Sequence, residues 1–273
     1  MCVTVSEQVM KQEILHVAVL QQDIVWEAPE ENYKRVAATL EQALKERKTD
    51  VIVVPETFTA GFGDHMARSA EPPLGATYRF ALQMARHYDA LFVGTWPVIE
   101  EGLVYNRLHM VRPDGGCDTY DKAHTFRMSS EASQLARGRR RVTVEWRGWR
   151  IRPAVCYDLR FPLWLRNTRD WDYDLLLLCA NWPGSRYEAW RTLLRARAIE
   201  NLSYAIGCNR TGQDGTGIAY AGCSAVVDYK GIALTEAAPC IEHSSEQVLQ
   251  AELSASALDR FRQHWPFNLD FDE

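Results

Sequence analysis

The sequence of 273 residues lacks a long hydrophobic run and a closely spaced pair of cysteines, and its first residues are not expected to act as a secretory leader. Its longest strongly apolar stretch, residues 175–180, is far shorter than the roughly 20 residues of a membrane-spanning helix. The seven cysteines are an odd number and lie scattered, which argues against a disulfide framework and a zinc site. The N-terminal segment carries acidic residues and has no long apolar core. We therefore expect a cytoplasmic protein with reduced thiols and no membrane partner.

Positive charge is also scarce, since 31 Lys and Arg face 36 Asp and Glu and give a formal net charge of −5. The overall field does not favour polyanions, so nucleic acid is not expected as a partner. No linker rich in Pro, Gly or Ser, no composition shift and no internal repeat divides the chain, and 47% hydrophobic residues suffice for a large core. We expect a single domain over residues 1–273, with its core over about 12–254 and a C-terminal tail over 255–273.

Short segments rich in β-branched and aromatic residues alternate with segments of helical periodicity along the whole chain. Such alternation predicts mixed sheets covered by helices, and not an all-β sandwich or a helix bundle. The predicted fold class is α/β. The expected strands span residues 14–22, 51–56, 90–98, 107–113, 151–158, 174–182, 204–210, 224–229 and 248–253, and the expected helices span 30–47, 76–88, 186–201 and 254–264.

Three polar residues stand where expected strands end. Glu56 and Cys156 each terminate an apolar strand, and Lys122 lies just beyond another strand and its turn. In open α/β sheets, ligands tend to bind in the crevice outside the carboxyl ends of the strands. These three side chains are therefore candidates for one site.

Cys156 and Glu56 have the chemistry of a nucleophile and a base. Cys156 lies where a strand gives way to a turn near Pro162, and a helix N-terminus or a nearby cation would lower the pKa of its thiol. A partly buried Glu56 could accept a proton from a thiol or from water. The alternatives are an inert packing cysteine for Cys156, and a surface or helix-capping glutamate for Glu56.

Lys122 lies in the segment TYDKAHTFRM, which follows the turn RPDGG. A solvated loop lysine is the ordinary interpretation. The chemical alternative is that its ammonium, together with backbone N–H groups, stabilises the oxyanion that forms during acyl transfer. The neighbouring His124 is expected to make a loop hydrogen bond and is not needed as a base.

Together the contexts VVPETFTAGF, YDKAHTF and VCYDLRFP resemble the nitrilase superfamily of carbon–nitrogen hydrolases, in the same order along the chain. The segments 195–210 and 222–231 extend the resemblance over nearly the whole chain. It implies an α-β-β-α sandwich, a mechanism without metal or other cofactor, and association into a homodimer or larger homo-oligomer. It also implies that Cys156 is the nucleophile, Glu56 the general base and Lys122 the stabiliser of the tetrahedral intermediate, with the backbone N–H of Tyr157 as a second oxyanion donor.

Within that superfamily, CYDLRFP together with ANWP resembles the omega-amidases, which release ammonia from the side-chain amide of 2-oxo acids such as 2-oxoglutaramate and 2-oxosuccinamate. The family's second glutamate matches Glu131, although a helix-start carboxylate is an equal interpretation of that residue. Other amidase, carbamoylase or nitrilase activities stay open. A catalytically silent scaffold is disfavoured by the intact triad, and a thiol redox protein by the absence of any CxxC pair.

Residues near these motifs are the candidate walls of a substrate pocket. The resemblance implies that Arg160 binds the substrate's far carboxylate in a bidentate manner, and the alternative is an internal salt bridge with Asp158 or another acid. The aromatic candidates have the alternative of being core residues, and Arg186 that of a surface residue at a helix start. The full set of predicted wall residues is Tyr157, Arg160, Trp182, Arg186, Phe126 and Phe58.

Overall fold

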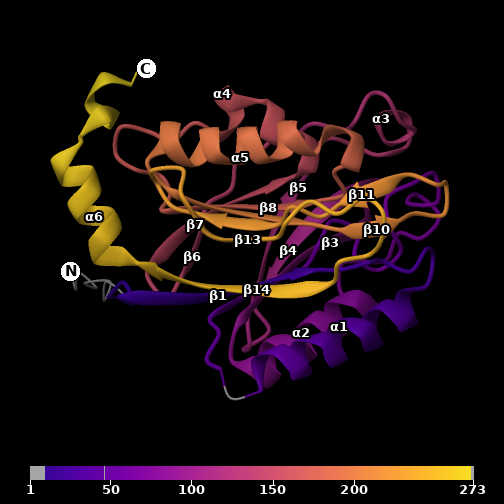
Figure 1. Cartoon of the computed structure of the whole chain (residues 1–273). Coiled ribbons are helices and arrows are strands. Elements are labelled where there is room, and N and C mark those ends of the chain that lie inside the picture. The colour runs from indigo at the N-terminus through magenta and orange to yellow at the C-terminus, as the bar shows by residue number, and fades with distance from the viewer. Residues whose placement is uncertain (1–9, 46, 272–273) are drawn as a thin grey trace, which may run out of the picture.

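The computed structural model describes residues 10–45 and 47–271, and two six-stranded sheets form its centre (Figure 1). The first sheet has the strand order β14-β1-β2-β3-β4-β5, and the second has the order β13-β12-β9-β8-β7-β6. The first comprises β1 (Ile14–Gln21), β2 (Val51–Val53), β3 (Leu91–Glu100), β4 (Leu103–Val111), β5 (Cys117–Asp121) and β14 (Gln247–Ser254). The second comprises β6 (Val144–Trp146), β7 (Trp149–Val155), β8 (Leu175–Ala180), β9 (Tyr204–Asn209), β12 (Ala225–Val227) and β13 (Ala233–Glu236), while β10 (Thr211–Gln213) and β11 (Ala219–Ala221) pair separately.

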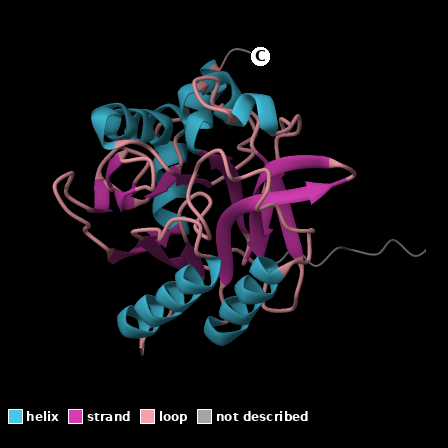
Figure 2. Cartoon of the chain, turned by 90° about the vertical axis from the view of Figure 1, so that its right-hand side faces the viewer, coloured by secondary structure: helices cyan, strands magenta, loops and turns pink. Residues whose placement is uncertain are grey.

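Helices cover the outer faces of both sheets, which confirms the predicted α-β-β-α sandwich. Figure 1 shows α1 and α2 below the first sheet and α5 above the second, and the turned view of Figure 2 shows the same layers. The helices are α1 (Pro29–Leu44), α2 (Ala76–Tyr88), α3 (Glu131–Gln134), α4 (Pro162–Leu165), α5 (Tyr187–Asn201) and α6 (Ala255–His264).

The apolar strands are buried on both faces, and alternate residues serve different layers. In β2, Val51 and Val53 pack into the core between the two sheets, while Ile52 packs against α1 and α2. In β8, Leu175 and Leu177 join the same inter-sheet core, while Leu176 and Leu178 pack beneath α5. Full burial of each such side chain stabilises the fold by about 1.5–3 kcal/mol. This is why the strand segments read as continuous apolar runs.

Parallel pairing brings the functional strand ends to one place. β1, β2 and β3 are parallel neighbours in the first sheet, and β7, β8 and β9 are parallel neighbours in the second. Glu56, which was expected to end its strand, is the third residue after β2, whereas Cys156 and Asn181 come directly after β7 and β8. The carboxyl ends of strands from both sheets therefore face one region, as the sequence predicted.

The predicted strands and helices are all present, with small shifts at their ends. The strand expected over 151–158 stops at Val155, because Cys156 adopts a left-handed backbone with φ of +44° and begins a short 3₁₀ helix, Cys156–Arg160. The expected tail over 255–273 begins with α6, whose Leu258 is fully buried in the inter-sheet core. The short strands β5, β6, β10, β11 and β13 and the short helices α3 and α4 were not predicted.

No helix in the described ranges is long and apolar enough to cross a bilayer. Cys2 lies outside the described residues, and the six cysteines that the structure describes are all free thiols.

Candidate active site

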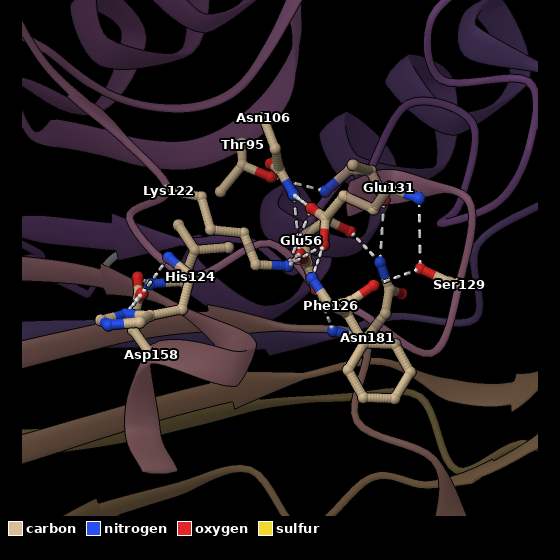
Figure 3. A network of polar contacts seen from close by, with 12 residues as sticks. Glu56, Thr95, Asn106, Lys122, His124, Phe126, Ser129, Glu131, Asp158 and Asn181 are labelled. Carbon is tan, nitrogen blue, oxygen red and sulfur yellow. Dashed lines mark hydrogen bonds and ion pairs between the residues drawn. The ribbon is translucent and has the colours of Figure 1, made fainter. Parts of the chain in front are cut away.

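Glu56 is fully buried at the base of the site and accepts several hydrogen bonds. Its Oε1 accepts from Asn106 Nδ2 at 2.8 Å and from Lys122 Nζ at 2.9 Å, and its Oε2 accepts from the backbone N–H of Asn181 at 2.8 Å (Figure 3). The short stretch after β2, with Pro55 just before the glutamate, brings the carboxylate into the interior. The surface-loop alternative for Glu56 is therefore wrong.

Lys122 lies directly after β5, and its side chain is only 1% exposed. Its Nζ is 2.9 Å from Glu56 Oε1 and 2.9 and 3.0 Å from the two oxygens of Glu131. Burial acts to lower the pKa of Lys122, but the Glu131 and Glu56 carboxylates outweigh it and raise that pKa above the ordinary lysine value. The lysine is therefore a buried ammonium, and the solvated-loop alternative is wrong.

Glu131 is the first residue of α3 and also forms an ion pair with Lys122, so a position at a helix start does not exclude a place beside the lysine. Its carboxylate also accepts from the backbone N–H of Phe126 at 2.6 Å and from Asn106 Nδ2 at 3.1 Å. Burial raises the pKa of Glu131, and the nearby Lys122 ammonium opposes that effect. Asn106 thus holds both carboxylates around a single ammonium.

Cys156 stands at the turn between β7 and the 3₁₀ helix. A non-glycine residue with positive φ costs of order 1–3 kcal/mol and is concentrated at functional sites. Burial of the thiol and the adjacent Glu56 carboxylate raise the pKa of Cys156 well above its ordinary value, although the Lys122 ammonium opposes them. The expectation of a lowered thiol pKa is therefore wrong, because burial and the carboxylate dominate over the cation.

Asp158 holds the turn that carries the thiol. Its carboxylate accepts from Tyr120 Oη at 2.7 Å and from the backbone N–H of Val155 at 3.0 Å, and its other oxygen lies 2.7 Å from His124 Nδ1. The His124 ring also stacks on Phe161 with centroids 3.7 Å apart. The prediction that His124 makes a loop hydrogen bond is confirmed, and this network ties the loop after β5 to the loop after β7.

A cleft of about 570 Å³ opens above these groups and reaches Cys156, Lys122 and Asn181. Five of the six predicted wall residues line it. Arg160 lies over the Trp182 ring, 5.0 Å from its centroid, and Arg186 lies over the Phe126 ring at 5.6 Å. The five are Tyr157, Arg160, Trp182, Arg186 and Phe126.

The prediction that Phe58 is a wall residue of the pocket is wrong. Phe58 is fully buried in the core between the first sheet and its helices and does not line the cleft. Its ring packs against Phe92 and Trp96 at centroid distances of 6.1 and 6.2 Å. The salt bridge considered for Arg160 is also absent within residues 10–45 and 47–271, because Asp158 pairs with His124 instead.

The comparisons with known proteins agree with this geometry. The family model for carbon–nitrogen hydrolases matches residues 16–263. The chain is 42% identical to omega-amidase YafV of Yersinia enterocolitica over 95% of this chain and 97% of that protein.

The chain belongs to the carbon–nitrogen hydrolase family.

A solved structure supports the membership at the level of the fold. XC1258 from Xanthomonas campestris, a superfamily protein with an arsenic adduct in its active site, is 41% identical over 96% of this chain and 98% of its own, with a TM-score of 0.91. Nit3 of Saccharomyces cerevisiae, at 24% identity with 94% and 96% coverage, shares the fold with a TM-score of 0.84. This carbon–nitrogen hydrolase therefore has the fold that its resemblance implied.

Sequence reasoning missed several residues around the hydrolase site. Asn106 and Asn181 contact Glu56 from positions 50 and 125 residues away, so these contacts do not follow from a local pattern. His65, which is 2% exposed, lines the cleft beside Trp26. The available signals were the position of Asn181 directly after an apolar strand and its place in the motif ANWP.

Proposed function

We propose that this hydrolase is an omega-amidase that converts the side-chain amide of a small 2-oxo acid, such as 2-oxoglutaramate or 2-oxosuccinamate, into the acid and ammonia. The observation that carries the proposal is the full-length similarity to proteins of that activity. Besides YafV, the 2-oxoglutaramate amidase of Bacillus subtilis is 30% identical over 92% of this chain and 95% of its own. The buried set of Glu56, Lys122 and Cys156 at one cleft supplies chemistry that fits the reaction.

In the first half of the reaction, Cys156 Sγ attacks the amide carbon while Glu56 takes the thiol proton. The raised pKa of Cys156 means that the thiol is protonated at rest, so the proton moves as the C–S bond forms. The tetrahedral intermediate then loses its C–N bond. Glu56 returns the proton to the departing nitrogen, which leaves as ammonia, and the acyl group stays on sulfur as a thioester.

In the second half, Glu56 takes a proton from water as the water oxygen attacks the thioester carbon. The C–S bond breaks, the acid leaves, and Glu56 gives the proton back to sulfur. Glu56 therefore begins and ends the cycle ionised. Its three hydrogen bonds fix the carboxylate in place for both proton transfers.

The Lys122 ammonium and the Tyr157 backbone N–H stabilise the oxyanion in both halves. Lys122 retains its positive charge because of its two carboxylate neighbours, so it acts as a fixed positive charge and not as an acid. Glu131 positions that ammonium through both of its oxygens and does not need to exchange a proton. The fully buried arrangement strengthens each of these interactions, because little water competes.

The far carboxylate of the substrate needs a cation in the cleft, and we propose Arg160 for that role. Its guanidinium lies over Trp182 and makes no ion pair with another described residue, so its donors are available to a ligand. Arg186, over Phe126, is the second candidate. The homodimer or larger homo-oligomer remains a prediction of the family resemblance.

Ammonia release from a panel of compounds tests the function. The panel holds 2-oxoglutaramate, 2-oxosuccinamate, a neutral amide of similar size, a nitrile and a carbamoyl compound. We expect kcat/KM to be highest for the two 2-oxo acid amides. If the enzyme turns over a nitrile or a carbamoyl compound faster than both 2-oxo acid amides, the omega-amidase proposal is wrong. The protein is then a nitrilase or a carbamoylase instead.

A further inference from the structure

Asn181 is held tightly beside the reacting groups. It is the first residue after β8, is 4% exposed and lines the cleft together with Cys156 and Lys122. Its backbone N–H donates to Glu56 Oε2 at 2.8 Å, which fixes one oxygen of the proposed base.

The side-chain amide of Asn181 has only one possible orientation. Its Nδ2 donates to the backbone oxygen of Glu56 at 2.7 Å and to Thr57 Oγ1 at 2.8 Å. A backbone carbonyl can only accept, so the atom facing Glu56 must be the nitrogen and both of its hydrogens are in use. The remaining atom, Oδ1, is therefore an acceptor whose place is fixed by its neighbours.

Oδ1 of Asn181 is buried and, across the part of the chain that the structure describes, has no hydrogen-bond partner. Leaving a buried acceptor unpaired costs about 1–3 kcal/mol, so an unpaired acceptor on a residue that lines a ligand cleft points to a donor supplied by the ligand. Asn106 offers a contrast: its Oδ1 is also unpaired, but Asn106 does not line the cleft.

We infer that Asn181 Oδ1 accepts a hydrogen bond from the carboxamide nitrogen of the substrate and so positions the leaving group. The inference rests on the proposed function, because an ionised 2-oxo acid amide has hydrogen-bond donors only on that nitrogen. When sulfur attacks, the nitrogen becomes pyramidal and gains a localised lone pair. With one N–H held by Oδ1, that lone pair turns toward Glu56, which must protonate it before the C–N bond breaks.

Asn181 therefore fixes both partners of the proton transfer, the base through its backbone N–H and the leaving nitrogen through its side chain. The same arrangement selects for amides over esters. The leaving oxygen of an ester has lone pairs and no hydrogen, so it would face Oδ1 without a bond and with electrostatic repulsion.

The test compares a matched pair of substrates, 2-oxoglutaramate and the 5-methyl ester of 2-oxoglutarate, in the wild type and in Asn181→Ala. Both substrates form the same thioester, so kcat/KM reports the step in which the leaving groups differ. We expect kcat/KM for the amide to fall about 10- to 100-fold, the effect of one lost hydrogen bond in a transition state. We expect kcat/KM for the ester to fall by a much smaller factor, so that the ratio of kcat/KM for the amide to kcat/KM for the ester drops.

Thr57→Val is the matched control, because it removes a partner of Asn181 Nδ2 and leaves Oδ1 in place. Thr57→Val should change kcat/KM for the amide and for the ester by the same factor. Circular dichroism verifies that each variant is folded, and Asn181→Ser replaces Asn181→Ala if the alanine variant does not fold. An unchanged amide-to-ester ratio in the Asn181 variant would overturn the inference. A wild type that hydrolyses no 2-oxo acid amide would instead overturn the proposed function.

Discussion

At the scale of single residues, the site is unusual in burying three ionisable groups together. Glu56 and Glu131 are fully buried and Lys122 is 1% exposed, so two carboxylates share one ammonium away from water. Desolvation of charges is costly, and an apolar replacement of similar volume would often be as stable or more stable. This arrangement is therefore better explained by catalysis than by folding stability.

Replacing Glu56 with glutamine tests its role as the base. The amide is nearly isosteric but cannot accept the thiol proton, so we expect kcat/KM for 2-oxoglutaramate to fall by about 10²- to 10⁴-fold. Glu236→Gln is the matched control, because Glu236 pairs with Arg191 and Arg195 outside the cleft. The control should keep wild-type kinetics. If both variants keep wild-type kinetics, Glu56 is not the general base.

The resting thiol of Cys156 should be protonated at neutral pH, because burial and Glu56 raise its pKa. A thiolate absorbs in the ultraviolet, and subtracting the spectrum of Cys156→Ala isolates this one group. We expect the difference signal to be absent at neutral pH and to rise only above the ordinary thiol pKa of about 8.5. A full thiolate signal at neutral pH would show a preformed thiolate and contradict the coupled proton transfer.

Arg160→Lys tests the proposed contact with the substrate carboxylate. Lysine cannot reproduce the bidentate fork of a guanidinium, so KM for 2-oxoglutaramate should rise. A neutral amide without the carboxylate should be processed no worse than by the wild type. If both substrates suffer alike and the melting temperature falls, Arg160 is structural and Arg186 becomes the candidate for the carboxylate.

The local sequence predicted Glu56, Lys122 and Cys156 because each stands in a short, recognisable context. It did not predict the raised pKa of Cys156, which depends on how the surrounding residues enclose the thiol and on Glu56, which comes from the other sheet. The contacts of Asn181 and Asn106 with Glu56 were not predicted either, because they join segments that are distant in the sequence. Phe58 was misassigned because proximity to Glu56 in sequence did not say which way its side chain turns.

At the scale of elements, apolar runs predicted the buried strands and periodicity predicted the long helices. The missed elements are short, and their pairing depends on tertiary partners. β5, with the sequence CDTYD, has no apolar run and forms because it pairs with β4 over five residues. Its absence from the prediction matters, since β5 is the strand that delivers Lys122.

Gly94 in β3 supports the loop that carries Glu56. A Cβ at this position would clash with Val54 Cγ2 and crowd the Phe58 ring, on either side of the glutamate. Gly94→Ala should therefore destabilise the fold by about 1–3 kcal/mol and also lower kcat/KM by displacing Glu56.

Leu258→Ala in α6 is the control for Gly94→Ala, because it opens a cavity worth about 2–5 kcal/mol in a buried position that does not line the cleft. Urea denaturation measures both stabilities, and kinetics are compared where both variants are folded. An alanine at Gly94 that loses stability but keeps wild-type kcat/KM would contradict the supporting role of Gly94.

At the scale of the whole molecule, alternation of strands and helices predicted the class, whereas the layering came from the family resemblance. Composition could not say that the strands divide into two sheets or that Val51 and Leu175 meet in a shared core. That division is what makes the site possible. Glu56 and Lys122 come from the first sheet and Cys156 and Asn181 from the second, so the packing of the two sheets assembles the site.

The central claim is that catalysis passes through a thioester on Cys156, and ammonia release by Cys156→Ala tests it most directly. The substitution removes only a sulfur at a half-buried turn, so the variant should fold with a melting temperature close to that of the wild type. It should release no ammonia from 2-oxoglutaramate above the uncatalysed rate, because the covalent route is lost. A folded Cys156→Ala variant that retains a substantial fraction of wild-type activity would contradict the account.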